Sequence, residues 1–285
     1  MTQAASETRE SGATRIAVVP FSACIITFNE ERNILDALHS IEFADEIVVV
    51  DSRSTDRTRE IVASFRGRSR DGREVIPRLI ERDWPGHVEQ KNFAIDQAAH
   101  DWVLCIDADE RVSPELRAEI EHVLSRDPPP YDGYSMPRRT FYLGRWILRG
   151  GWYPDRKLRL FRRSHGRWGG TNPHDHVHLD GREKRLRGDL LHFSYREMAD
   201  HVRTINSFTD IASREKARRR IRFPVLRMLV QPPFKFFKMY VLKQGFREGT
   251  AGLIVAVLGS FYVFLKYAKL WERTVAYRRK PYEEE

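Results

Sequence analysis

The sequence predicts an α/β fold, with a mostly parallel, Rossmann-like sheet that carries helices on both faces. Between residues 20 and 130, short apolar runs alternate with stretches of helical periodicity. The apolar runs are near-continuous, which is typical of parallel strands that are buried on both faces. Acidic and polar residues follow these runs directly, and ligands bind beyond the carboxyl ends of the strands in such sheets.

In chain order, this part of the sequence reads as strands and helices in turn. Ile34, Leu38 and Ile41 have the i, i+4 and i+7 spacing of one helix face. Ser113-Pro114 is a helix start, with proline at the first helical position. We expect strands at 22–28, 46–51, 74–80 and 102–106, and helices at 31–41, 56–65, 87–99 and from 113 onward.

Composition divides the chain into four parts. Residues 1–19 are mostly small and polar, and we expect a disordered leader there. Residues 20–130 form the strand–helix half. Residues 131–194 carry short β-like runs broken by Gly, Pro and aromatic residues, which predicts a mixed-sheet extension. The pattern of residues 195–285 predicts amphipathic and hydrophobic helices.

The net charge of +9 is concentrated in one segment. Residues 214–247 hold eleven Lys or Arg and one Glu, a local balance of +10 that leaves the rest of the chain near −1. Basic segments attract nucleic acid or anionic lipid. Lysines and aromatic residues share helical faces here, and no recognised nucleic-acid motif accompanies them. We therefore expect contact with an anionic membrane surface and none with nucleic acid.

Residues 251–265 form an uncharged run of fifteen residues. A membrane-spanning helix needs about 20 apolar residues, and Lys266 and Lys269 follow this shorter run. The run predicts an in-plane or shallowly re-entrant membrane helix. The alternative is a hydrophobic helix packed on protein. We expect Pro232-Pro233 to interrupt the helix that precedes this run.

Overall composition indicates a soluble globular protein, because 41% of residues are hydrophobic and 31% are charged. The two cysteines, Cys24 and Cys105, each lie inside an apolar run. Free Cys is among the most buried residue types, so both are predicted to be buried thiols. Two isolated cysteines are consistent with a reducing cytoplasm.

The most informative motif follows the predicted strand at 102–106. There Asp107, Asp109 and Glu110 place three carboxylates within four residues, where they repel one another. Two carboxylates one residue apart are suited to sharing a divalent cation, Mg²⁺ or Mn²⁺, which also binds substrate phosphates. The alternative is that the aspartates cap the next helix, but Ser113 already provides a cap. No P-loop and no GxGxxG motif follows the first strand.

Three motifs together resemble one family. IITFNEERNI, VVVDSRSTDRT and CIDADERV follow one another at predicted strand ends. In this order they resemble the nucleotide-sugar glycosyltransferases of family 2, which have the GT-A fold. The similarity covers about residues 20–275 and is greatest to the bacterial subgroup that adds glucose to the heptose inner core of lipopolysaccharide. Residues 20–130 and 131–194 would then be the donor-binding and acceptor-binding halves of a GT-A domain.

The resemblance implies roles for particular residues on the donor side. Lys91 would lie near the nucleotide, and Asp107 would contact ribose or metal-bound water. Asp109 would bind the metal directly, and His192 would complete the metal shell. Base and ribose would be held by the segment after the first strand and the acid after the second, which are Thr27, Phe28, Asn29, Glu30 and Asp51.

The resemblance also implies a general base, because an inverting transfer requires the attacking hydroxyl to lose its proton. The related sequences carry a VHE pattern where this chain has Pro173-His174-Asp175. Asp175 is our candidate, and Asp155 in GGWYPD is the alternative. Trp152 and Trp168 are candidates for stacking on sugars, although either suits the core equally well.

The function expected from these features is inverting, metal-dependent transfer of a sugar, glucose from UDP-glucose by resemblance. The acceptor would be a lipid-linked glycan such as the lipopolysaccharide inner core, reached from the inner face of the membrane by a peripheral cytoplasmic protein. Polyprenyl phosphate or another acceptor stays open. A nucleotidyltransferase of similar sheet is the other alternative, but it would need a basic, glycine-rich loop where this chain has the acidic FNEERN.

Overall fold

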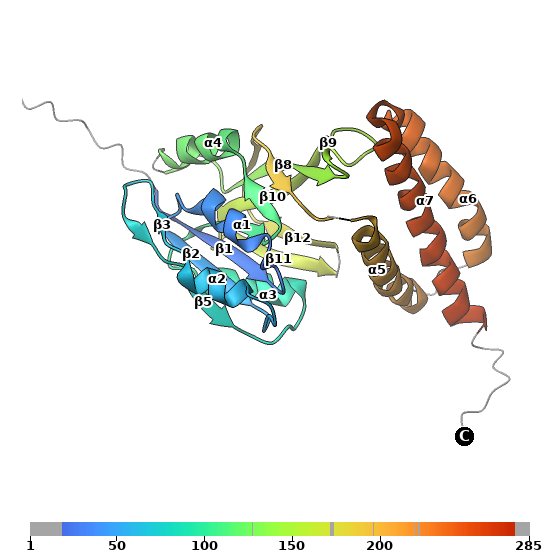
Figure 1. Cartoon of the computed structure of the whole chain (residues 1–285), viewed down its shortest axis with the longest axis horizontal. Coiled ribbons are helices and arrows are strands. Elements are labelled where there is room, and N and C mark those ends of the chain that lie inside the picture. The colour runs from blue at the N-terminus through green and yellow to red at the C-terminus, as the bar shows by residue number, and fades with distance from the viewer. Residues whose placement is uncertain are drawn as a thin grey trace, which may run out of the picture.

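The computed structural model describes residues 19–276 apart from 127, 172, 173, 196, 220 and 222. An α/β body and a group of C-terminal helices lie side by side (Figure 1). The predicted leader falls outside the described residues, except for Val19.

A ten-stranded sheet forms the body, in the order β5-β2-β1-β6-β10-β8-β14-β7, with β9 and β13 attached to β8. β5, β2, β1 and β6 are parallel, whereas β10 runs antiparallel to both β6 and β8. The predicted parallel sheet with a mixed extension is therefore confirmed. Its strands are β1 Phe21–Thr27, β2 Glu46–Asp51, β5 Arg78–Glu81, β6 Trp102–Asp107, β7 Glu110–Val112, β8 Gly133–Tyr142, β9 Arg145–Ile147, β10 Asp155–Arg162, β13 Glu183–Arg185 and β14 Leu190–His192.

Helices and small hairpins cover the two faces of this sheet. The hairpins are β3 Gly67–Arg68 with β4 Glu74–Val75, and β11 Gly166–Thr171 with β12 His174–Leu179. The Ser113 side chain accepts a hydrogen bond from the Leu116 amide at 3.2 Å, so the predicted helix cap is confirmed. The helices of the body are α1 Ile34–Ile41, α2 Thr58–Ser64, α3 His87–Asp96 and α4 Pro114–Leu124.

Successive residues of the central strands point to opposite faces of the sheet and therefore contribute to two separate hydrophobic cores. On one face Ala23 and Ile25 pack with residues of α1, α2 and α4. On the other face Cys24 and Cys105 pack with α3 and the β11–β12 hairpin, and both thiols are buried and free. Burial on both faces explains the near-continuous apolar runs of the sequence.

The C-terminal region is helical, as predicted. α7 packs against both α5 and α6, and Glu248 at its start fastens it to the body. The Glu248 carboxylate is 3.2 Å from the Arg145 guanidinium and accepts a hydrogen bond from the Leu148 amide at 3.2 Å. The helices are α5 Met198–Arg218, α6 Pro224–Phe237, a π-helical turn η1 Lys238–Leu242, a 3₁₀ turn η2 Gly245–Glu248, α7 Gly249–Trp271 and a second π-helical turn η3 Glu272–Ala276.

One face of α7 is buried in the protein and another is exposed. Val255 and Ala256 pack with Tyr142 and Ile147 of the body. Among the described residues, the helical segment Gly245–Ala276 is by length and composition apolar enough to cross a bilayer, but 33% of its most apolar window is buried. The exposed large side chains of α7 are Leu253, Val257, Phe261, Phe264 and Trp271.

Two predicted elements differ from the structure. The strand expected at 74–80 is divided into β4 and β5, because Pro77 lies between them and has no amide hydrogen for a sheet ladder. α6 continues through Pro232-Pro233, which were expected to interrupt it. Pro232 is buried and its carbonyl accepts a hydrogen bond from the Ser260 hydroxyl of α7 at 2.7 Å. Packing on α7 therefore outweighs the local cost of proline within a helix.

Candidate active site

The candidate site lies at the carboxyl ends of the central parallel strands. Thr27 at the end of β1 is paired in register with Asp51 of β2, and Ile26 with Asp107 of β6. A cavity of about 620 Å³ opens at this edge. A parallel sheet binds ligands at this position.

The structure brings together most of the residues predicted from the motifs. Eight of them line this cavity: Thr27, Phe28, Glu30, Lys91, Asp107, Asp109, Asp175 and His192. They come from β1, α3, β6, β12 and β14 and from the turns that follow β1 and β6. Phe28 is 55% exposed, which leaves its ring free for a ligand.

Asp107 is held by two cations. One carboxylate oxygen lies 3.0 Å from the Lys91 ammonium, and the other lies 2.7 Å from the Arg159 guanidinium. Burial disfavours the charged carboxylate, but Arg159 and Lys91 outweigh this effect and keep the pKa of Asp107 well below its ordinary value. Asp107 is therefore ionised at neutral pH, and its charge is already balanced within the protein.

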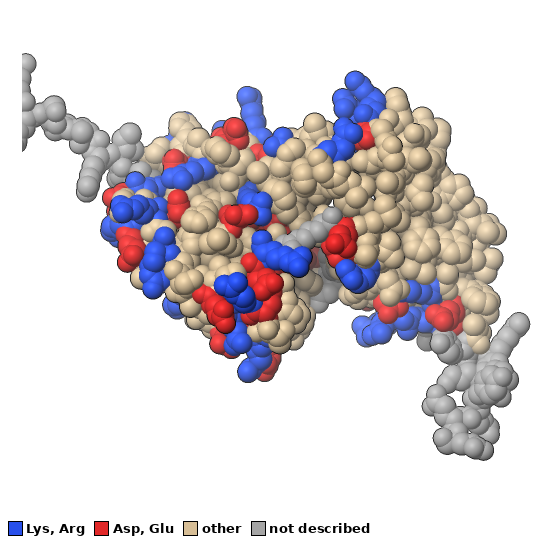
Figure 2. Space-filling view, in the orientation of Figure 1, with Lys and Arg blue, Asp and Glu red and all other residues tan. Residues whose placement is uncertain are grey.

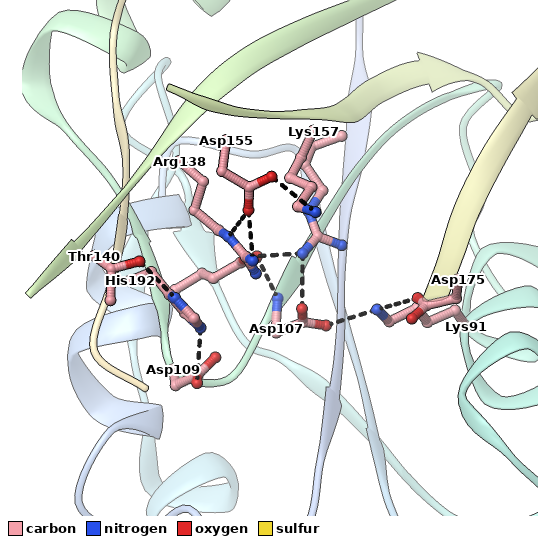
Figure 3. A network of polar contacts seen from close by, with 11 residues as sticks. Lys91, Asp107, Asp109, Arg138, Thr140, Asp155, Lys157, Asp175 and His192 are labelled. Carbon is pink, nitrogen blue, oxygen red and sulfur yellow. Dashed lines mark hydrogen bonds and ion pairs between the residues drawn. The ribbon is translucent and has the colours of Figure 1, made fainter. Parts of the chain in front are cut away.

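Asp109 faces a different partner. Its carboxylate lies 3.2 Å from Nε2 of His192, whose Nδ1 is 3.3 Å from the Thr140 hydroxyl (Figure 3). Burial raises the pKa of Asp109, but His192 outweighs burial, so the pKa lies below its ordinary value. A carboxylate oxygen and an imidazole nitrogen facing each other beside a cavity suit a divalent cation.

This pair fits the expected Mg²⁺ or Mn²⁺. Such ions are commonly held by one or two protein ligands together with water and substrate phosphates. Asp109 and His192 would hold the ion. The part of the chain that the structure describes contains no preassembled group of three His, Cys, Asp or Glu ligands.

Asp175 shares Lys91 with Asp107. The Asp175 carboxylate is 2.8 Å from the Lys91 ammonium (Figure 3). That ammonium also lies 4.3 Å from the centre of the Trp168 ring. Burial raises the pKa of Asp175, and the Lys91 charge lowers it further than burial raises it. Lys91, only 7% exposed, thus links the β6 acid to the base candidate on the β11–β12 hairpin.

Glu110 and Arg138 are important to this site and were not assigned a role from the sequence. Glu110 is fully buried, and its carboxylate contacts the Arg159 guanidinium at 2.8 Å and Arg138 at 3.2 Å. It also accepts a hydrogen bond from the Asp107 amide at 3.0 Å, which fixes the backbone of the acidic turn. The third carboxylate of the acidic run is therefore structural. The sequence contained a signal for this role, namely the acid Glu110 together with cationic residues on a neighbouring β-like run.

Asp51 and Asn29 lie outside the lining of the cavity of about 620 Å³. Asp51 is fully buried and its carboxylate accepts hydrogen bonds from the amide and hydroxyl of Ser54, at 2.7 and 2.5 Å. Asn29, with φ of 54°, accepts a hydrogen bond from the Thr55 amide and lines an adjacent cavity of about 440 Å³. Both residues shape the loop after β2, and their contact with base or ribose stays a prediction.

The alternative base, Asp155, also lies outside this lining. Its carboxylate is 2.7 Å from the Arg138 guanidinium and 3.2 Å from the Lys157 ammonium. Burial raises the pKa of Asp155, but the two cations keep it below its ordinary value. It faces a neighbouring cavity, which Trp152 also lines.

Comparison with known proteins identifies the class. The mostly parallel sheet matches the structures of GT-A glycosyltransferases. A mannosyltransferase from Pyrobaculum calidifontis, solved with GDP-mannose and Mn²⁺, superposes with a TM-score of 0.50 at 16% identity, over 91% of this chain and 90% of that one. The model of glycosyl transferase family 2 matches residues 22–177.

The chain belongs to glycosyl transferase family 2 and is a glycosyltransferase. It is 32% identical to the lipopolysaccharide core biosynthesis glycosyltransferase LpsC of Rhizobium meliloti, over 90% of this chain and 94% of LpsC. An uncharacterized glycosyltransferase of Rickettsia typhi is 29% identical, over 90% of this chain and 88% of its own.

Proposed function

We propose that this protein transfers a sugar, with inversion, from a nucleotide diphosphate donor to a lipid-linked glycan of the lipopolysaccharide core. The donor is UDP-glucose by the resemblance of the motifs. The observation that carries the proposal is the convergence of Asp109, His192, Lys91 and Asp175 on the cavity of about 620 Å³, which we call the donor cavity from here on. The similarity to a lipopolysaccharide core glycosyltransferase supports the acceptor class.

Donor binding follows from the charges of the cavity. A divalent ion at Asp109 and His192 would neutralise the charge of the departing diphosphate. Lys91 and Arg159 lie beside the Trp168 ring, 4.3 and 5.3 Å from its centre. Their charges offset those of Asp107, Asp175 and Glu110, which would otherwise repel the diphosphate. Because Asp107 already has two cationic partners, we assign it to ribose or metal-bound water instead of direct metal contact.

Proton removal is assigned to Asp175. Its carboxylate is ionised at neutral pH, since Lys91 holds its pKa below the ordinary value, and it lines the same cavity as Asp109. An ionised carboxylate there accepts the proton of the attacking hydroxyl as the bond to the anomeric carbon forms. Asp155, which faces the neighbouring cavity, is the second candidate.

We further propose that the C-terminal helices lie on the inner face of the membrane. Side chains of α6 are exposed and apolar, with Leu226 60%, Leu229 63% and Phe234 61% exposed. In the view of Figure 2 these helices present a broad uncharged face, whereas charged side chains crowd the sheet half. Exposed apolar helix faces flanked by lysines bind in the interfacial plane of anionic bilayers.

The deciding experiment is a thermal-shift panel of nucleotide sugars with and without Mn²⁺, followed by analysis of the product and its anomeric configuration. We expect stabilisation by UDP-glucose that requires Mn²⁺ and is lost in Asp109→Asn. Asp36→Asn, an exposed acid on α1, should keep it. Undiminished stabilisation of Asp109→Asn would remove Asp109 from the metal site, and release of pyrophosphate from a nucleoside triphosphate would indicate nucleotidyl transfer.

A further inference from the structure

A second cavity, of about 530 Å³, lies between the sheet half and the C-terminal helices. Arg138, His192 and Tyr195 line both this cavity and the donor cavity, so the two adjoin. We call it the lysine cavity, because Lys235, Lys238 and Lys243 also line it. Its position places any ligand beside the donor.

The charges of the lysine cavity are unbalanced. Among the described residues, the side chains of the three lysines have no hydrogen-bond or ion-pair partner. The carboxylate in the described lining, Asp155, is already engaged by Arg138 and Lys157. A surplus of cations therefore lines a half-open cavity, where an anion would be attracted.

Lys235 carries the strongest case for an anionic ligand. It is half-buried at the end of α6, and burial, with a further contribution from Lys238, lowers the pKa of its ammonium. Removing a cation from water beside a like charge is unfavourable unless a counter-ion is present. A bound anion would relieve both effects.

Part of the remaining lining is apolar. Met239, Val255 and Leu258 line the cavity. The helices α6 and α7 also carry exposed apolar side chains, Phe234, Val257 and Phe261. An amphipathic ligand would thus find cations at the donor side and apolar surface toward the proposed membrane face. Gly150 and Gly151, with φ of 73° and 84°, complete the wall against Lys243.

We propose that the lysine cavity binds a phosphate group of the lipid-linked acceptor, with Lys235, Lys238 and Lys243 as its ligands. The proposal rests on the proposed function, because it places the acceptor next to the donor cavity. Several ammonium groups around one cavity suit a phosphate dianion, which lysines bind as point charges. The apolar lining accommodates the part of the acceptor nearest its lipid.

The test compares two variants that remove the same charge. Lys235→Gln/Lys238→Gln alters the cavity, and Arg214→Gln/Arg218→Gln alters two exposed residues of α5 outside its lining. Binding of decyl phosphate, decyl glucoside and inorganic phosphate is measured by calorimetry, below the micelle concentrations and without donor or metal. Each variant is also tested for Mn²⁺-dependent stabilisation by UDP-glucose.

We expect the unaltered protein to bind decyl phosphate most tightly, and Lys235→Gln/Lys238→Gln to bind it about tenfold more weakly. The arginine variant should bind it normally, and donor stabilisation should be unchanged in both. Equal weakening in the two variants, or equal affinity for decyl glucoside, would overturn the phosphate site. Equal affinity for inorganic phosphate would overturn the lipid assignment. Because donor binding is measured separately, failure here is distinguishable from failure of the glycosyltransferase proposal.

Discussion

The sheet half and the C-terminal helices differ in whether their charged side chains have partners and in where their large apolar side chains lie. In the sheet half, buried acids meet cations or hydrogen-bond donors, as Asp107 meets Lys91 and Arg159. In the helices, lysines face a cavity without acids to balance them, and large apolar side chains lie on the surface. The charge pattern of Figure 2 follows the same division. The buried charges of the sheet half are therefore paired within the protein, whereas the helical region exposes apolar side chains and lysines without acidic partners.

The largest expected effect comes from breaking the paired charges of the sheet half. Arg159→Met leaves Asp107 and the fully buried Glu110 without their shared guanidinium. We expect a loss of about 3–5 kcal/mol in the free energy of unfolding, measured in urea. Lys157→Met removes a partly exposed partner of Asp155 and should cost about 1 kcal/mol or less. Equal losses of stability in the two variants would show that the buried ion pairs of Arg159 contribute no more than the partly exposed pair of Lys157.

The second prediction concerns the exposed apolar face of α6. Leu226→Ser/Leu229→Ser/Phe234→Ser should reduce binding to phosphatidylethanolamine–phosphatidylglycerol vesicles by about a hundredfold or more, since each immersed side chain contributes about 1.5 kcal/mol. Stability should change little, because all three are at least 60% exposed. Leu35→Ser/Ile76→Ser, exposed in the sheet half, should keep normal vesicle sedimentation. Equal vesicle binding by all forms would contradict the membrane assignment.

The third prediction concerns His201, where α5 meets the body. His201 is 5% exposed, its Nδ1 is 2.8 Å from the Tyr142 hydroxyl, and burial lowers its pKa from 6.5 to about 4. The unfolded chain therefore binds the proton first as the pH falls, so stability decreases from about pH 6.5 down to about pH 4. The loss should reach about 2 kcal/mol at pH 5.

His201→Asn keeps a partner for Tyr142 and should remove this part of the pH dependence of stability. The measurement is urea unfolding at a series of pH values for both proteins. An unchanged slope between pH 6.5 and 5 in His201→Asn would show that other groups cause it.

The smallest expected change is a displaced pH profile. Without the Lys91 ammonium, burial and the Asp107 charge are opposed only by Arg159, so the pKa of the Asp175 carboxyl rises. The acidic limb of kcat/KM in Lys91→Met should therefore move to higher pH, and Lys91→Arg should restore it. A lower rate with an unmoved acidic limb would separate Lys91 from the base and favour Asp155.

Much of the fold was predictable because local patterns agreed with the tertiary arrangement. The strand at 46–51 was predicted at its observed bounds, since its apolar run ends in a turn-forming cluster. The acidic turn was placed at a strand end for the same reason. Pro77 and Pro232 show the limit: the missing amide hydrogen of Pro77 divided the expected strand, whereas packing on α7 kept Pro232 within a helix.

The sequence by itself determined which residues follow the apolar runs at the carboxyl edge of the sheet, because apolar periodicity and the residues that end each run are local properties. Only the tertiary structure decided how their charges combine. It brings Lys91 into contact with both Asp107 and Asp175. The buried Asp51 carboxylate accepts hydrogen bonds from Ser54, and Glu110 has a structural role as a partner of Arg159. Contacts between residues as far apart in the chain as Lys91 and Asp175 depend on how α3 and the β11–β12 hairpin pack on one face, which no local pattern records.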